Sequence, residues 1–204
     1  MAWAGVEDRR PAGEGYSPPD RGLVATELTG QTPGMDVLSA IRSKRDTRAF
    51  TDQPVPNDVL GRVLDAARMA GSAKNRQPVR LIVVTDPEVI EALKGPCDFA
   101  VWIHGAPIVV VGCVERSDSI RLQFDLGRHL QNLMLAAHAE GLATCPVTVQ
   151  RVADVAPILG IPDSHEALMY IPLGYKAKGG EAPAVIASPR LSMDDYVSHG
   201  SFDG

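Results

Sequence analysis

The sequence predicts a single folded domain that contains both helices and strands. The chain has 204 residues, a length at which one domain with one hydrophobic core is the usual arrangement. Two short apolar runs rich in β-branched residues, at 80–85 and 107–114, are typical of buried strands. A long segment at 118–140 carries apolar residues at helical spacing.

The other predicted elements follow from caps and apolar spacing. The first helix has Thr32 as its N-cap and Pro33 at its first helical position, followed by an apolar set at Val37, Leu38 and Ile41. Further helices are predicted from Pro56 to about Met69, at 87–94 and at 151–159, with a third strand at 167–175.

The segment 118–140 is predicted to be the central helix. Its apolar residues at helical spacing are Leu126, Leu130, Leu133, Met134 and Ala137. Gly141 follows as the C-cap. Gly127 within the helix costs about 1 kcal/mol relative to Ala, so we expect another helix to approach closely there. An apolar stripe of this kind is typical of a monomer core.

Residues 1–34 differ in composition from the rest of the chain. They contain six Gly and four Pro without a clear period, so they offer no apolar face for a core of their own. We expect a flexible N-terminal arm at 1–34 and one domain at 35–204.

Charge and cysteine usage restrict the partners and the compartment. A net charge of -5 and a pI of about 5.5 disfavour binding to nucleic acid and to anionic membranes. The three cysteines form no CxxC pair, which fits a reducing compartment. The longest apolar stretch, 106–114, is too short to span a bilayer, and the N-terminus lacks the apolar run of a secretory signal. We therefore expect a cytoplasmic protein.

Several common catalytic motifs are absent from the sequence. It contains no GxGxxG fingerprint, no GxxxxGK[ST] phosphate loop, no GxSxG elbow and no HExxH zinc pair. Its five histidines show no metal-ligand spacing. The sequence therefore predicts no metal site.

A basic cluster stands out against the negative net charge. Arg42, Lys44, Arg45 and Arg48 fall within seven positions. One interpretation is a solvated charged face at the end of a helix, where cations are favoured. The other is phosphate binding, because in an extended segment Arg42, Lys44 and Arg48 point the same way while Arg45 points elsewhere. Spacing alone does not decide between them.

An ordered set of motifs surrounds this cluster. They are "KRDTRAF" (44–50), "QPVP" (53–56), "AGSAKNRQPVRLIVVTD" (70–86), "FDLGRHLQNLMLAAHAEGLAT" (124–144), "LGIP" (159–162) and "IPLGY" (171–175). In this order the chain resembles the nitroreductase family of flavoproteins over roughly residues 35–198, and the resemblance favours phosphate binding by the cluster.

The resemblance implies a fold and a cofactor. The fold is α+β, with three layers in which a central mixed or antiparallel sheet is flanked by helices. The implied assembly is an intertwined homodimer with flavin mononucleotide (FMN) at the subunit interface, and in that dimer the helix at 118–140 lies in the interface. The implied electron donor is NADH or NADPH.

The resemblance also implies site residues. Lys44, Arg45 and Arg48 hold the phosphate, ribityl chain and pyrimidine edge, and a positive charge from Arg48 near N1 and C2=O stabilises reduced flavin. Ser72, Asn75 and Gln77 are implied to contribute from the facing subunit. The backbone of Pro146, Val147 and Thr148 is implied to form the loop that passes flavin N5. Arg190 resembles a late basic residue that closes on the phosphate. Asn75 and Gln77 bring amide groups suited to a pyrimidine edge.

The implied activity is a two-step oxidoreductase reaction. Hydride passes from the nicotinamide to flavin N5, and a small conjugated acceptor such as a nitroaromatic or a quinone is then reduced in the same pocket. No catalytic side chain is predicted, because the flavin carries the chemistry. The alternatives are a flavin store or sensor without turnover, and a scaffold that has lost its cofactor.

Two departures from the family pattern bear on this interpretation. Asp46 stands where the family usually has Ser, and its carboxylate repels a phosphate unless it pairs with Arg45 or Arg42. The segment between the strand ending near Val114 and the long helix is nearly absent, whereas larger members carry a helical insertion there. The sequence therefore makes no prediction of the acceptor.

Overall fold

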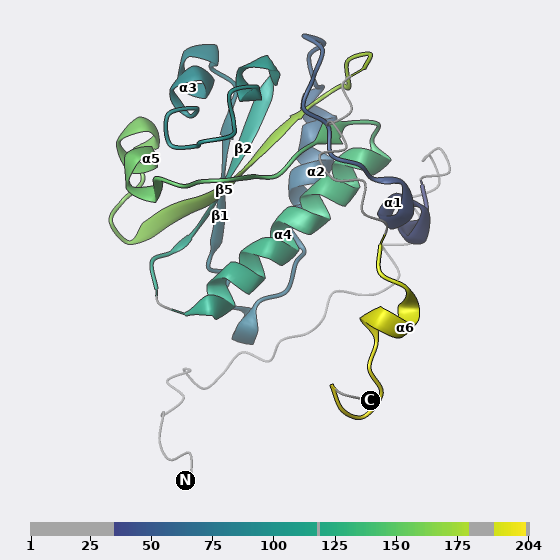
Figure 1. Cartoon of the computed structure of the whole chain (residues 1–204). Coiled ribbons are helices and arrows are strands. Elements are labelled where there is room, and N and C mark those ends of the chain that lie inside the picture. Colours follow the sequence, from purple (N-terminus) through teal and green to yellow (C-terminus); the bar gives the residue numbers. More distant parts are fainter. Residues whose placement is uncertain (1–34, 118, 180–189, 203–204) are drawn as a thin grey trace, which may run out of the picture. The chain divides into compact units, whose positions relative to one another are not determined.

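The computed structural model describes residues 35–117, 119–179 and 190–202. The predicted arm at 1–34 lies outside the described residues, so the division into arm and domain remains a prediction. Figure 1 shows a central sheet with helices on both of its faces, which confirms the α+β class and the three layers.

The sheet is antiparallel throughout its strand pairs. Its order is β1 (Val79–Val84), β2 (Ile108–Glu115), β5 (His165–Gly174) and β3 (Ala143–Thr144), and β4 (Val147–Thr148) also pairs with β5. The three long strands confirm the predicted ones to within two residues. The two-residue strands β3 and β4 were not predicted, because so short a run shows no period.

Most helices also lie where the spacing predicts them. They are α2 (Asn57–Arg68), α3 (Pro87–Ala92), α4 (Ile120–Ala139) and α5 (Val152–Leu159), with short turns η1 (Ala73–Asn75), η2 (Ile103–Gly105) and α6 (Met193–Tyr196). Only four residues separate β2 from α4, in agreement with the short connection expected there. Over the described ranges, none of these helices is both long and apolar enough to cross a membrane.

The prediction for the first helix was wrong in its start. Helix α1 spans Val37–Ser43, and its N-cap is Asp36, whose carboxylate accepts a hydrogen bond from the Ser39 N–H at 3.1 Å. The cap of the described helix is therefore Asp36, and the predicted cap Thr32 lies outside the described residues. The predicted apolar set is exposed on this helix, by 70%, 60% and 53% for Val37, Leu38 and Ile41.

Strand β2 is buried on both faces and joins the two cores. Val110 and Val114 belong to the core cluster under α2 and α4, whereas Val109 and Val111 belong to the one under α3 and α5. Because side chains alternate along a strand, an uninterrupted apolar run such as "IVVV" serves both cores. This run therefore lies at the centre of the sheet.

Glycine allows α4 to approach the sheet, but not at the position expected. A Cβ at Gly112 of β2 would lie 2.9 Å from Leu126 Cδ1 of α4, so a side chain there would force the Leu126 and Leu130 side chains to shift. A Cβ at Gly127 would meet nothing within 4 Å in this chain. The close approach expected at Gly127 is thus not made by another helix of the same described chain.

The core on the α3 and α5 side contains ionisable groups, which makes stability depend on alkaline pH. Burial raises the pKa of the Cys113 thiol from 9.0 to about 11. The folded thiol keeps its proton while the unfolded thiol ionises, so this stability is complete below pH 9 and is lost as the pH rises toward 11. Burial also raises the pKa of Tyr170, which adds to the loss.

We predict that the free energy of unfolding falls between pH 8 and pH 10, and that Cys113 accounts for about 1 kcal/mol of the fall. Urea titrations at both pH values give the fall in the free energy of unfolding for the wild-type protein and for Cys113→Ala. The difference between these two falls is the share of Cys113. An equally steep fall in the variant would contradict it.

Candidate functional site

Residues 44–51, called here the basic segment, are held along the ends of two strands by main-chain hydrogen bonds. The Thr47 N–H donates to the Thr144 carbonyl at 3.1 Å, and the Thr51 N–H donates to the Tyr175 carbonyl at 2.8 Å. The Ala177 N–H donates to the Ala49 carbonyl at 3.1 Å. Residues 46–51 therefore extend from β3 to the residues after β5, and their positions relative to the sheet are fixed.

Two cations of this segment line one cavity. The cavity, called here the basic cavity, has a volume of about 460 Å³ and is lined by Lys44, Arg45 and Thr47 together with residues at the end of α4 and in β3. The Lys44 ammonium donates to the Asp46 carboxylate, and only 12% of the Lys44 side chain is exposed. Arg45 Nη1 donates to the carbonyls of Arg42 and Lys44, each at 2.8 Å.

The expected grouping of the cations was wrong. Arg42 belongs to α1, so the alternation of an extended segment does not apply to it. Lys44 and Arg45, which were expected to diverge, both line the basic cavity. Asp46 pairs with Lys44, and not with Arg42 or Arg45, the two partners considered for it in the sequence.

Arg48 lies in different surroundings from the other two cations. Its guanidinium carbon is 5.7 Å from the centre of the Trp102 ring. Burial raises the pKa of the Cys145 thiol, and a hydrogen bond with the Arg48 side chain opposes this rise. Arg48 therefore lies near Trp102, which directly precedes η2, and near Cys145, which lies between β3 and β4.

A second cavity, called here the apolar cavity, lies between α4 and the strands β4 and β5. Its volume is about 400 Å³, and its walls include Pro146, Thr148, Leu130, Met134 and Met169. Val147 is buried in the core cluster on the opposite face of the sheet, so only its backbone faces this side. The predicted loop at 146–148 thus forms one wall of an apolar site.

One contact joins the walls of the two cavities. Lys44 of the basic cavity approaches the thioether of Met134 of the apolar cavity, with 3.8 Å between Nζ and Sδ. A cationic site and an apolar site are therefore adjacent, and this pairing suits a ligand that combines an anion with an aromatic ring system.

The loop at 72–77 has an unusual backbone. Lys74, Asn75 and Gln77 adopt positive φ angles of 53°, 53° and 52°. Such angles are uncommon for residues other than glycine and mark functional loops more often than average. The Ser72 hydroxyl accepts a hydrogen bond from the Gln77 N–H at 2.9 Å, which closes the loop.

The loop at 72–77 and the basic segment contact different parts of α4. Ala73 and Arg76 line a small cavity with Arg121 and Asp125, near the start of the helix. Lys44 contacts Met134, nine residues further along than Asp125, which is roughly 14 Å of helix. One chain therefore does not bring Ser72, Asn75 and Gln77 to Lys44.

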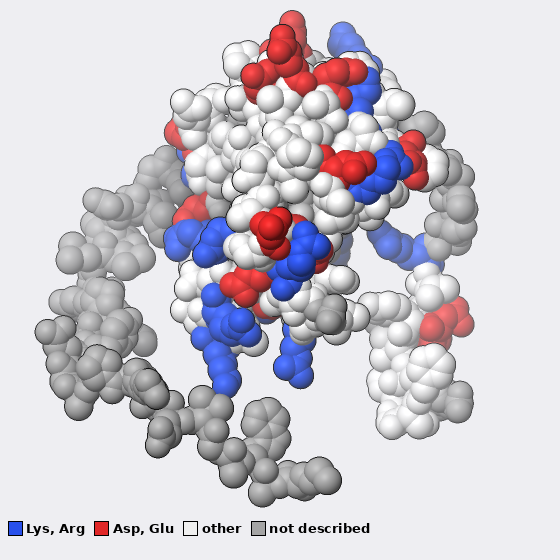
Figure 2. Space-filling view, turned by 90° about the vertical axis from the view of Figure 1, so that its left-hand side faces the viewer, with Lys and Arg blue, Asp and Glu red and all other residues white. Residues whose placement is uncertain are grey.

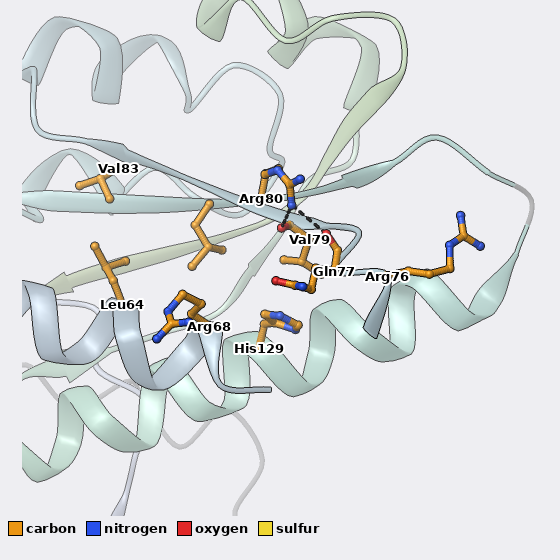
Figure 3. Close-up of a pocket in the computed structure, with 9 residues that line it drawn as sticks. Leu64, Arg68, Arg76, Gln77, Val79, Arg80, Val83 and His129 are labelled. Carbon is orange, nitrogen blue, oxygen red and sulfur yellow. Dashed lines mark hydrogen bonds between the residues drawn. The ribbon is translucent and has the colours of Figure 1, made fainter. Parts of the chain in front are cut away.

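Gln77 instead lines a third cavity, along the edge strand β1. This edge cavity has a volume of about 610 Å³, and Figure 3 shows Arg68, Gln77 and His129 around its interior while Arg76 is directed away. Arg80 Nη1 donates to the carbonyls of Gln77 and Val79 at 2.8 and 2.9 Å. His129 Nδ1 lies 2.8 Å from the Asp125 carbonyl.

The charge on the surface is unevenly distributed. On the face in Figure 2, acidic side chains gather toward the top and basic ones toward the lower edge, at the height where α4 begins in Figure 1.

Arg190 is exposed and directly follows residues 180–189, which lie outside the described residues. It lines neither the basic cavity nor the apolar cavity.

Comparison with known proteins identifies the family. A family model described as the nitroreductase family matches residues 41–102 and 99–175, well over half of the chain. The chain belongs to the nitroreductase family. This nitroreductase-family chain is 31% identical to a putative NADH dehydrogenase/NAD(P)H nitroreductase of Methanothermobacter thermautotrophicus, over 85% of this chain and 94% of that protein.

Two further comparisons agree with this assignment. An FMN reductase [NAD(P)H] of Bacillus subtilis is 24% identical, over 80% of this chain and 78% of that protein. The crystal structure of a putative NADH dehydrogenase/NAD(P)H nitroreductase from Parabacteroides distasonis superimposes with a TM-score of 0.72 at 24% identity, and covers 81% of this chain and 98% of that chain. The structural likeness confirms the nitroreductase fold.

Sequence reasoning missed the residues that surround Arg48. Trp102 lies 54 positions along the chain from Arg48 and Cys145 a further 43, so no local spacing connects them. Their only signal is rarity, because the chain has two tryptophans and three cysteines. The contacts arise from tertiary structure alone.

Proposed function

We propose that this chain is an FMN-dependent oxidoreductase that takes hydride from NADH or NADPH and reduces a small conjugated acceptor, such as a nitroaromatic or a quinone, in two alternating half-reactions. The observation that carries the proposal is the basic cavity beside the apolar cavity. Relatives named as an NAD(P)H nitroreductase and an FMN reductase support it.

The residues present fit FMN. A phosphomonoester carries close to two negative charges and needs several charged donors. Lys44 has three N–H donors and Arg45 has five, so each keeps donors beyond the contacts it makes within the chain. The apolar walls at Leu130, Met134 and Pro146 offer a surface for an isoalloxazine ring.

Each residue has a role that follows from its place. Lys44 and Arg45 bind the phosphate and ribityl end, Arg48 faces the pyrimidine edge, and the backbone at 146–148 lies along the ring. FMN, when bound, supplies the hydride acceptor and donor. The protein contributes orientation, electrostatics and exclusion of water, and a general acid is not required.

The proposal includes a homodimer in which the site is completed by the second subunit. Val37, Leu38 and Ile41, which are exposed apolar residues of one short helix, support it, and so does the exposed Phe124 of α4, because exposed apolar surface marks interaction sites. The separation of the loop at 72–77 from the basic segment supports it as well, since a second copy is needed to bring Ser72, Asn75 and Gln77 to the flavin. We place Arg190 at the phosphate on the family motif alone.

A reducing, cytoplasmic location is part of the same proposal. The three cysteines within the described ranges are free and buried, which is usual for proteins of a reducing compartment. The negative net charge supports a protein that binds neither nucleic acid nor anionic membranes.

The direct test is reduction of the FMN-loaded protein. Rapid mixing with NADH or NADPH without oxygen is expected to bleach the flavin faster than free FMN under the same conditions, and addition of a quinone is expected to restore the colour. Tight FMN binding without accelerated bleaching would overturn the enzyme and favour a flavin store. Failure to bind FMN would overturn both.

Lys44 tests the phosphate assignment. Lys44→Gln is expected to weaken FMN binding by about 1.5–3 kcal/mol, the worth of a hydrogen bond to a charged group. Arg42→Gln is the matched control, because Arg42 is a cation two positions from Lys44 but does not line the cavity. Isothermal titration of the apoprotein with FMN measures both, and equal losses in the two variants would contradict the assignment.

Gly127 tests the interface. We expect Gly127→Leu to dissociate the dimer of the apoprotein, because the new side chain has open space beside the apolar cavity in one chain and meets the facing helix only in the assembly. Gly61→Leu is the control, since Gly61 is an exposed helical glycine with equal space. Sedimentation velocity measures the outcome, and a wild-type monomer or an unaffected Gly127→Leu dimer would refute the interface.

A further inference from the structure

Arg48 contacts an aromatic ring and does not pair with a carboxylate within the described ranges. Within the described ranges it forms no ion pair with a carboxylate, whereas Lys44 is paired with Asp46. Its recorded partners are the Trp102 ring, 5.7 Å from the guanidinium carbon, and the thiol of Cys145. Neither partner carries a negative charge near neutral pH.

Trp102 is itself well anchored. Its ring stacks on Phe50 with 6.4 Å between centroids and an interplanar angle of 26°. Its indole N–H donates to the Phe99 carbonyl at 3.1 Å. Phe50 in turn packs over Gly174, where a Cβ would lie 3.4 Å from the Phe50 ring and 2.6 Å from Pro107. The indole is thus supported by Phe50 of the basic segment, which itself packs on the end of β5.

The nature of this platform matters for the charge that reaches a ligand. A carboxylate would also hold a guanidinium, but it would cancel most of the positive potential. An aromatic face attracts the cation through its quadrupole and leaves the net charge in place. Cys145 stays a neutral thiol, because burial raises the pKa of that thiol.

We propose that Trp102 is a positioning residue for Arg48. Its indole face orients the guanidinium toward the pyrimidine edge of the flavin without neutralising it, and so makes the two-electron midpoint potential of bound FMN less negative. This inference rests on the proposed function, because it assigns Arg48 to the flavin. It adds a residue outside the motifs that indicated the site, and it gives that residue a physical role.

The test compares variants of Trp102 that keep or remove the ring. In Trp102→Leu we expect the preference of the site for reduced over oxidised FMN to fall roughly tenfold. The midpoint potential of bound FMN then becomes more negative by about 30 mV, the value for a two-electron couple. Trp102→Phe keeps an aromatic face and is expected to retain most of the wild-type potential. Should Trp102→Leu fail to fold, Trp102→Met takes its place, because Met fills irregular apolar space without a ring.

A double variant separates positioning from general packing. In an Arg48→Met background, Trp102→Leu is expected to cause no further change in potential, because the group that it positions is gone. An equal shift with and without Arg48 would overturn the inference, as would an unshifted potential in Trp102→Leu. If the wild-type protein binds FMN and these shifts are absent, this inference alone fails. If the wild-type protein does not bind FMN, the proposed function fails with it.

Discussion

The candidate site depends on the main-chain hydrogen bonds that hold the basic segment along the sheet. Thr47 is bonded to Thr144 of β3, and Thr51 to Tyr175 at the end of β5. Three cations close together repel one another, so in a free loop they would spread into solvent. The hydrogen bonds to Thr144 and Tyr175 fix the backbone of this segment, and so the positions from which the three side chains extend in the site that we propose.

Helix α4 sets the second constraint. Its packing on β2 is close because Gly112 has no side chain, and its length separates the loop at 72–77 from the basic segment. A site that needs both groups is therefore incomplete in one chain. In the homodimer that we propose, the surface that α4 leaves exposed at Gly127 and Phe124 faces the second copy, so the same helix serves both folding and assembly.

Sequence reasoning succeeded where local periodicity determines structure. The runs at 80–85 and 107–114 and the stripe at 118–140 are long enough to show their period, and the order of motifs indicated the family. Sequence reasoning failed where two residues compete for the same local role, or where the residues in contact are far apart along the chain. Asp36 caps α1 in place of Thr32 because its carboxylate reaches the Ser39 N–H. The pairing of Arg48 with Trp102 joins residues 54 positions apart, so no spacing rule reveals it.

Lys44 and Arg48 are held in different ways, which bears on how an acidic protein could present the local anion site that we propose. Lys44 shares its charge with Asp46, so in the proposed site the neighbouring Arg45 guanidinium supplies positive charge that no carboxylate within the described ranges offsets. The ring end of a flavin gains only one negative charge on reduction, so a partly cancelled cation would do little there. An aromatic partner for Arg48 avoids that cancellation. The two ends of the proposed site thus hold their cations in different ways, because the charges they face differ in size.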